Sequence, residues 1–181
     1  MNLPNIMTLT RVLLIPLFVI FIINKLFGWA LITFAVAGIT DGIDGMIARI
    51  THKRTELGAY LDPIADKLLL IAAYVTLAII EILPGWLAVI VVTRDVIILL
   101  GFLILILLNY RPKIQPSLVS KVTTFFQIST ILLVFMADYA LILKELSVIA
   151  IYGTTLFTIV SGSHYLYWGA QILNGKKRMG D

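Results

Sequence analysis

The sequence predicts an all-α integral membrane protein with six transmembrane helices and a short N-terminal interfacial segment. Of its 181 residues, 60% are hydrophobic and 13% are charged, whereas about 25% of the residues in an average soluble domain are charged. The hydrophobic residues form six stretches, each close to the roughly 20 residues that a helix needs to cross a bilayer. Only short polar connections separate them, so residues 1–181 are expected to form a single membrane domain.

The segment Met1–Asn5 precedes the first apolar stretch, and Pro4 suits the first turn of a helix. No basic run comes before the apolar residues and no small-residue cleavage site follows them. The segment is therefore interpreted as mature interfacial sequence rather than as a signal peptide. The six expected spans follow in order: Thr8–Ile23, Trp29–Ile50, Leu57–Ile80, Trp86–Leu108, Leu118–Leu141 and Leu146–Leu173.

Polar residues and glycine mark the connections between spans, which are expected at Asn24–Lys25 with Gly28, Thr51–Glu56, Glu81–Gly85, Asn109–Ser117 and Lys144–Glu145. Basic residues concentrate near the second and fourth connections and in the C-terminal tail: Arg49, Lys53, Arg54, Arg111, Lys113, Lys176, Lys177 and Arg178. The other side carries only Lys25 and Lys144. By the positive-inside rule, both termini and the second connection face the cytoplasm of a cell inner membrane, or the matrix of a mitochondrial one.

Four aspartates flank the second connection, within TDGIDGMIARITHKRTELGAYLDPIADK. Asp41 and Asp44 are three positions apart, and Asp62 and Asp66 are four apart, so each pair lies on one face of its expected helix. The short connection makes the two helices antiparallel neighbours and brings both pairs to a similar depth. Carboxylates are costly in a membrane without compensation, and divalent cations bind clustered carboxylate oxygens. The cluster predicts one or two bound cations and chemistry on phosphate.

The residues beside the aspartates suit a phosphate ligand. Gly45, Gly58 and Ala48 leave space next to the acids, and the forked guanidinium of Arg49 suits phosphate oxygens. The alternative is that the aspartates cap helices or pair with the nearby basic residues, and that the glycines are helix-packing positions. Four acids in register with two glycines favour the metal site, and the packing role of the glycines is compatible with it.

These eight residues meet every fixed position of D-x2-D-G-x2-A-R-x8-G-x3-D-x3-D, so the chain resembles the CDP-alcohol phosphatidyltransferase family. The resemblance implies a phospholipid-biosynthesis enzyme with six transmembrane helices, usually a homodimer, and a cytoplasm-facing cavity open to the bilayer. It implies CDP-diacylglycerol as donor, CMP as leaving group, and two divalent cations, Mg2+ or Mn2+. The expected partners are these lipids, a lipid acceptor and the membrane bilayer, with no nucleic acid.

Carried over position by position, the resemblance assigns a role to each residue of the signature. The metal ligands would be Asp41, Asp44, Asp62 and Asp66, and Asp66 would also be the catalytic base. The contacts to CDP-diacylglycerol would be Gly45, Ala48, Arg49 and Gly58. The chemistry agrees, because attack by an acceptor hydroxyl requires neutralised diphosphate charge, a stabilised CMP and a proton acceptor.

The N-terminus and the fourth and fifth spans bear on the acceptor. NLPNIMTLTR resembles the opening of family members that act on glycerol-based acceptors. Phosphatidylglycerophosphate synthases show Arg-Glu in the fourth span, a second Arg two turns on, and then G-K-x-K-T-x-x-Q. Here Asp95 follows Arg94, Phe102 takes the place of the second Arg, and Thr123 takes the place of the second Lys. This pattern resembles the CMP-forming cardiolipin synthases, which use phosphatidylglycerol.

Arg94 and Lys121 are thus the candidate acceptor-binding residues. Phosphatidylglycerol carries one diester charge and needs fewer cations than glycerol 3-phosphate, a dianion that remains the alternative acceptor. In a purely structural alternative, Arg94 pairs with Asp95 within the helix and Lys121 reaches the membrane interface.

The remaining features of the sequence say less about function. His164 in the sixth span is interpreted as structural, and Tyr165, Tyr167 and Trp168 as an interfacial aromatic belt. The absence of cysteine excludes disulfides and thiolate metal sites. A small ion transporter is the remote alternative function, because intramembrane acids often mark ion paths. Transporters, however, place such groups on the broken helices of an internal repeat, and this sequence shows no repeat.

Overall fold

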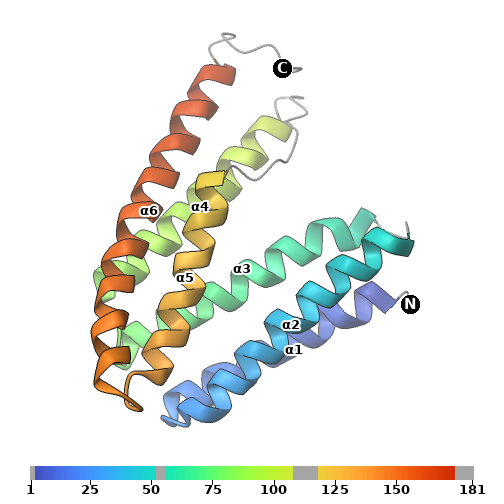
Figure 1. Ribbon diagram of the computed structural model, residues 1–181. Helices are drawn as coiled ribbons and strands as arrows, with labels where there is room; N and C mark the ends of the chain where they lie inside the picture. Colours follow the sequence, from blue (N-terminus) through green and yellow to red (C-terminus); the bar gives the residue numbers. More distant parts are fainter. Residues whose placement is uncertain (1–2, 52–55, 108–117, 174–181) are drawn as a thin grey trace. The chain divides into compact units, whose positions relative to one another are not determined.

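The computed structural model describes residues 3–51, 56–107 and 118–173, with side chains described for 13–40, 67–101, 103, 104, 107 and 118–171. Regular structure in these ranges is entirely helical, without a strand, which confirms the all-α class for this part of the chain. In chain order (Figure 1) the helices are α1 (Leu3–Ile23), α2 (Phe27–Thr51), α3 (Glu56–Ile79), α4 (Gly85–Leu107), α5 (Leu118–Met136) and α6 (Leu141–Leu173).

The first four helices follow the predicted spans to within a few residues, apart from the start of α1. That helix is continuous from Leu3, so the described part of the segment Met1–Asn5 belongs to α1, and its interfacial position stays a prediction. Pro4 lies in the first turn of α1, where a proline replaces an amide that has no partner within the helix.

The turn between α5 and α6 corrects a prediction. A connection at Lys144–Glu145 is wrong, because α5 ends at Met136 and both charged residues lie in α6. The chain turns at residues 137–140, where the amide of Tyr139 donates to the carbonyl of Met136 at 3.0 Å. Lys144 and Glu145 are exposed, and both are residues that helices accommodate well on their surface.

Two helices of the described chain are long and apolar enough to cross a bilayer by length and composition, over Leu118–Met136 and Leu141–Gln171. Shorter apolar helical stretches cover Leu13–Ile23, Phe27–Thr40 and Lys67–Ile79. These helices suggest a membrane protein. Six complete spans stay a prediction.

The chain divides into two compact units, Met1–Gly85 and Trp86–Asp181, and the expected single domain over 1–181 stays a prediction. In the first unit α1 packs against both α2 and α3 (Figure 1). Phe18 of α1 and Phe34 of α2 are buried, with ring centroids 5.7 Å apart. Tyr74 and Leu77 of α3 are fully buried. This packing fixes the two helices that carry the aspartate signature within one unit.

Helices α1 and α3 each end two residues before a charged residue with left-handed backbone, Lys25 at φ 57° and Glu81 at φ 61°. After α1, the amides of Lys25 and Leu26 donate to the carbonyls of Ile22 and Phe21 at 2.9 and 2.8 Å. This is the Schellman pattern, which satisfies the last carbonyls of a helix. Glu81 and the residue after it repeat the pattern at the end of α3. Both stops fall where the sequence predicted a connection.

In the second unit, α5 and α6 pack along one another through buried hydroxylated side chains (Figure 1). Thr123 and Thr130 lie seven positions apart on α5, as Thr154 and Ser161 do on α6, so each pair occupies one helix face. The hydroxyls of Thr130 and Thr154 are hydrogen-bonded at 2.8 Å. Small residues allow close approach of membrane helices, and hydroxyls bond across the interface.

Gly153 of α6 provides a prediction about this interface. A Cβ atom at this position would lie 2.8 Å from Cε1 of Phe126 on α5. The Phe126 ring cannot retreat freely, because it stacks on Phe157 with centroids 4.6 Å apart. We expect Gly153→Ala to lower the free energy of unfolding by about 1–3 kcal/mol, the usual cost of overpacking. Thermal unfolding of the purified protein in detergent measures this change.

Gly169→Ala is the matched control on the same helix. A Cβ at Gly169 meets nothing within 4 Å, and alanine favours a helix over glycine by about 1 kcal/mol. This control should therefore unfold at or slightly above the wild-type temperature. Equal unfolding temperatures for Gly153→Ala and Gly169→Ala would contradict the close packing of Gly153 on Phe126.

Candidate functional site

The signature residues lie on two helices of the first unit. Asp41, Asp44, Gly45, Ala48 and Arg49 belong to α2, and Gly58, Asp62 and Asp66 belong to α3. Both helices are continuous through the signature, so their backbones support the helical spacing used above. The side chains of all eight residues lie outside the described part of the structure. The metal, donor and base assignments made for them therefore stay predictions.

The chemistry of the signature fits a hard divalent cation. Mg2+ and Mn2+ prefer carboxylate oxygens, and four aspartates supply them. Just before the signature, the hydroxyl of Thr40 donates to the carbonyl of Val36 at 2.7 Å and stays within its own helix. Among the side chains that the structure describes, no group of three His, Cys, Asp or Glu residues could hold a metal. The candidate metal site thus depends on the signature aspartates.

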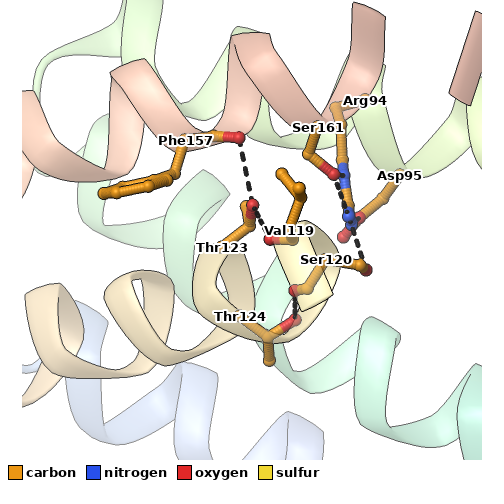
Figure 2. Close-up of polar contacts among 8 residues, drawn as sticks. All are labelled: Arg94, Asp95, Val119, Ser120, Thr123, Thr124, Phe157 and Ser161. Carbon is orange, nitrogen blue, oxygen red and sulfur yellow. Dashed lines mark hydrogen bonds and ion pairs between the residues drawn. The ribbon is translucent and has the colours of Figure 1, made fainter. Parts of the chain in front are cut away.

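Arg94 of α4 forms a buried polar centre in the second unit, shown in Figure 2. Arg94 is 4% exposed and Asp95 is 2% exposed. The guanidinium Nη1 donates to Oδ1 of Asp95 at 2.5 Å. Its Nη2 donates to the hydroxyls of Ser120 on α5 and Ser161 on α6, at 2.8 and 2.7 Å. A buried ion pair needs such additional hydrogen bonds to offset its desolvation, and here they link three helices.

Three residues of α6 lie against Arg94: Ser161, Gly162 and Tyr165. Nε of Arg94 also donates to the Ser161 hydroxyl, at 3.3 Å. A Cβ on Gly162 would touch Cγ of Arg94 at 3.6 Å, so the arginine stem passes close to the α6 backbone. The ring of Tyr165 lies 5.8 Å from Cζ of Arg94, within cation–π range. One turn of α6 thus contacts the arginine at its stem and at its guanidinium group.

Thr123 and Lys121 of α5 were both singled out by the sequence, and the structure places them differently. Thr123 is fully buried, and its hydroxyl lies 2.8 Å from the carbonyl of Val119 and 3.0 Å from that of Phe157 on α6 (Figure 2). A threonine here joins α5 to α6 at a fully buried position. Lys121 is exposed, one residue after Ser120. The two candidate acceptor residues therefore differ in solvent exposure, because Arg94 is buried and Lys121 is exposed.

Sequence reasoning missed the partners of Arg94. The sequence indicated no role for Ser120 and Ser161. The ring of Tyr165, predicted as part of an interfacial aromatic belt, also lies near the guanidinium. His164 is exposed and meets the Tyr165 ring edge-on, with centroids 6.1 Å apart. The available signal was the spacing of four between Ser161 and Tyr165, which places both on one face of a helix.

Comparison with known proteins identifies close sequence similarity over most of the chain. A family model described as CDP-alcohol phosphatidyltransferase matches residues 1–160. The chain is 31% identical to a CDP-diacylglycerol–glycerol-3-phosphate 3-phosphatidyltransferase of Bacillus subtilis, covering 91% of this chain and 93% of that protein. It is 34% identical to a probable phosphatidylglycerophosphate synthase of Mycobacterium tuberculosis, covering 91% and 80%.

A third relative carries a different name. The chain is 32% identical to a cardiolipin synthase (CMP-forming) of Streptomyces coelicolor, covering 96% of this chain and 80% of that protein. The identities to the three relatives are nearly equal. Overall similarity therefore does not distinguish between the two acceptor classes that these names imply. Only individual residues can distinguish them.

Proposed function

The chain belongs to the CDP-alcohol phosphatidyltransferase family, and from this premise we propose that it is a metal-dependent phosphatidyltransferase of phospholipid biosynthesis. It transfers the phosphatidyl group of CDP-diacylglycerol to a hydroxyl of a glycerol-based acceptor and releases CMP. The observation that carries the proposal is the complete signature of eight residues at fixed spacing, in a chain that the family model matches over residues 1–160. Family membership also argues against the ion-transporter alternative.

The proposed reaction is a substitution at phosphorus. The acceptor hydroxyl oxygen forms a bond to the phosphorus that carries the diacylglycerol, and the bond from this phosphorus to the CMP oxygen breaks. The electron pair of the broken bond leaves on CMP, and the hydroxyl proton passes to a base. Bound Mg2+ or Mn2+ supplies neutralisation of the diphosphate charge. The remaining tasks are binding, orientation and proton transfer, which belong to residues of this chain.

The signature residues divide these tasks. Asp41, Asp44, Asp62 and Asp66 are proposed to hold the metal ions, because four carboxylates provide the hard oxygen ligands that these cations prefer. Asp66, the last of the set, is proposed as the general base for the acceptor hydroxyl. The proposed contacts to CDP-diacylglycerol are Gly45, Ala48, Arg49 and Gly58, in which the arginine fork matches phosphate oxygens.

The proposed acceptor is phosphatidylglycerol, which makes the chain a CMP-forming cardiolipin synthase. The supporting observation is the charge around Arg94 and Lys121. The charge of Arg94 is compensated by the buried carboxylate of Asp95, and Lys121 is the accessible cation of the pair. A net charge of about +1 at these three residues suits the single diester charge of phosphatidylglycerol better than a dianion, which needs several donors.

The alternative acceptor is glycerol 3-phosphate. It is favoured by the names of the relatives from Bacillus subtilis and Mycobacterium tuberculosis. The residues at two further positions count against it: Phe102 and Thr123 stand where phosphatidylglycerophosphate synthases carry cations. Thr123 is buried and within hydrogen-bonding distance of two backbone carbonyls.

An acceptor panel tests this choice. Purified full-length protein is incubated with labelled CDP-diacylglycerol and Mg2+ or Mn2+, and with one acceptor at a time: phosphatidylglycerol, glycerol 3-phosphate, inositol phosphate or serine. We expect cardiolipin and CMP from phosphatidylglycerol, and little product from glycerol 3-phosphate. Faster turnover with glycerol 3-phosphate would identify a phosphatidylglycerophosphate synthase instead, and would leave the donor and metal assignments intact.

The setting of the enzyme is part of the proposal. Six spans are supported by the six helices of the described chain, the first four of which follow the expected spans to within a few residues. Two of the six, α5 and α6, are long and apolar enough by themselves to cross a bilayer. Because both substrates are lipids, a site open to the bilayer serves them. The placement of basic residues supports an inner membrane with the signature on the cytoplasmic or matrix side. A homodimer is proposed from the family resemblance.

A further inference from the structure

We infer that Ser161 and Ser120 are positioning residues of the acceptor subsite, which act by fixing the guanidinium group of Arg94. The inference rests on the proposed function, because it requires Arg94 to meet the phosphate of the acceptor. The chain offers the two serines on different helices, Ser120 on α5 and Ser161 on α6, and both accept hydrogen bonds from Arg94 of α4.

The hydrogen bonds fix the orientation of the guanidinium plane. The hydroxyl oxygen of Ser161 accepts from both Nη2 and Nε of Arg94, at 2.7 and 3.3 Å, and so contacts one edge of the group at two points. Ser120 accepts from Nη2 at 2.8 Å, and Asp95 accepts from Nη1. Figure 2 shows the guanidinium held among these three side chains. Because the planar guanidinium has acceptors on two of its edges, and these acceptors come from α4, α5 and α6, its orientation is fixed.

The count of donors shows what remains for a ligand. An arginine side chain has five N–H donors. The hydrogen bonds of Arg94 to described residues use one on Nε, one on Nη1 and two on Nη2. One N–H on Nη1 therefore has no acceptor among the described residues. Since Nη2 and Nε are occupied by the serines, an anionic ligand is left with Nη1. The serines thus decide which atom of Arg94 meets the acceptor phosphate.

Packing on the α6 side supports the same role. Gly162 lets the arginine stem pass close to the helix, with 3.6 Å between its would-be Cβ and Cγ of Arg94. The Tyr165 ring lies 5.8 Å from Cζ. Ser161 is fully buried, so its hydroxyl faces Arg94 rather than solvent. By contrast, Ser163 is two residues further along α6 and exposed.

The test compares Ser161→Ala and Ser120→Ala with the control Ser163→Ala in purified full-length protein, with phosphatidylglycerol as acceptor. Each positioning variant should raise the KM for the acceptor about tenfold, the effect of losing one hydrogen bond to a charged group. The kcat and the KM for CDP-diacylglycerol should stay within about twofold, because these variants leave the donor-binding residues unchanged. Ser163→Ala should match the wild type throughout.

A comparison in a background without the buried charges separates positioning from general structural damage. Arg94→Gln and Asp95→Asn are combined to remove both buried charges together, because removing one alone strands the other. In this background Ser161→Ala should change the acceptor KM by less than about twofold, since residues acting through one group are not additive. An unchanged acceptor KM in both serine variants, a fall in kcat with equal changes in both KM values, or a full effect of Ser161→Ala in the neutral background would each overturn the inference.

Failure of the inference is distinct from failure of the proposed function. Wild-type protein that releases CMP from CDP-diacylglycerol in the presence of an acceptor supports the function, whatever the serine variants do. If Ser161→Ala does not fold, Ser120→Ala carries the same comparison from the half-buried side of the centre. Its acceptor KM then supports or overturns the inference.

Discussion

Complete removal of divalent cations is expected to abolish CMP release, and addition of Mg2+ or Mn2+ to restore it. The reason is the cost of the four signature aspartates, Asp41, Asp44, Asp62 and Asp66, which require compensation near a membrane. Without a cation the diphosphate of the donor also keeps its charge, and the departure of CMP is not assisted. The measurement is CMP release after dialysis against a chelator, followed by titration with each metal.

Substitutions of single aspartates locate this requirement. Asp41→Asn and Asp62→Asn should each weaken metal binding and CDP-diacylglycerol binding together, because each removes a charge from the proposed cluster. Asp138→Asn is a suitable control, since Asp138 is exposed in the turn between α5 and α6 and should leave both affinities unchanged. Full activity after exhaustive chelation would contradict the proposed metal site.

Asp66→Asn is expected to behave differently from the other aspartate variants. If Asp66 accepts the proton of the acceptor hydroxyl, its amide cannot do so, and kcat should fall by about 10²–10⁴-fold, the usual contribution of a general base. The affinity for CDP-diacylglycerol should be largely kept, because Asp66 is proposed at the edge of the metal cluster, whereas Asp41 and Asp62 are proposed at its centre. Single-turnover kinetics together with a donor-binding measurement separate these two effects.

The comparison with Asp62→Asn gives this prediction its control. Both variants lose one charge on α3. If Asp66 is the base, Asp66→Asn should lose more turnover than Asp62→Asn for the same loss of donor binding. Near-normal turnover of Asp66→Asn would assign the base to another residue. Equal loss of donor binding in both variants would reduce Asp66 to a metal ligand.

The fold could be predicted from the sequence where polar residues coincide with helix ends. Lys25 and Glu81 each lie just after the C-terminus of a helix, and both helix ends were predicted. The same rule failed between α5 and α6, because the strongest polar pair, Lys144 and Glu145, lies within a helix. The actual turn at residues 137–140 contains a single charged residue among apolar ones. Hydropathy cannot distinguish charges on an exposed helix face from charges in a turn.

The candidate site could be predicted where its residues are close in sequence. The signature of eight residues is local. So is the pairing of Arg94 with Asp95, which was predicted by the purely structural alternative for Arg94 and which the structure contains. Ser120 and Ser161 lie 26 and 67 residues from Arg94. Their contact depends on the register in which α5 and α6 pack, which no periodicity in a single helix defines. Convergence of the aspartate side chains likewise depends on packing between helices and stays a prediction.

The most direct test of phosphatidyl transfer is to measure CMP and lipid product together, with purified full-length protein, CDP-diacylglycerol, phosphatidylglycerol and Mg2+ or Mn2+. The account predicts that CMP and cardiolipin form in equal molar amounts, and that neither forms when the acceptor is omitted. Thermal unfolding of the same sample establishes that the protein is folded. Folded protein that releases no CMP from CDP-diacylglycerol with phosphatidylglycerol, glycerol 3-phosphate, inositol phosphate or serine would contradict the proposed function.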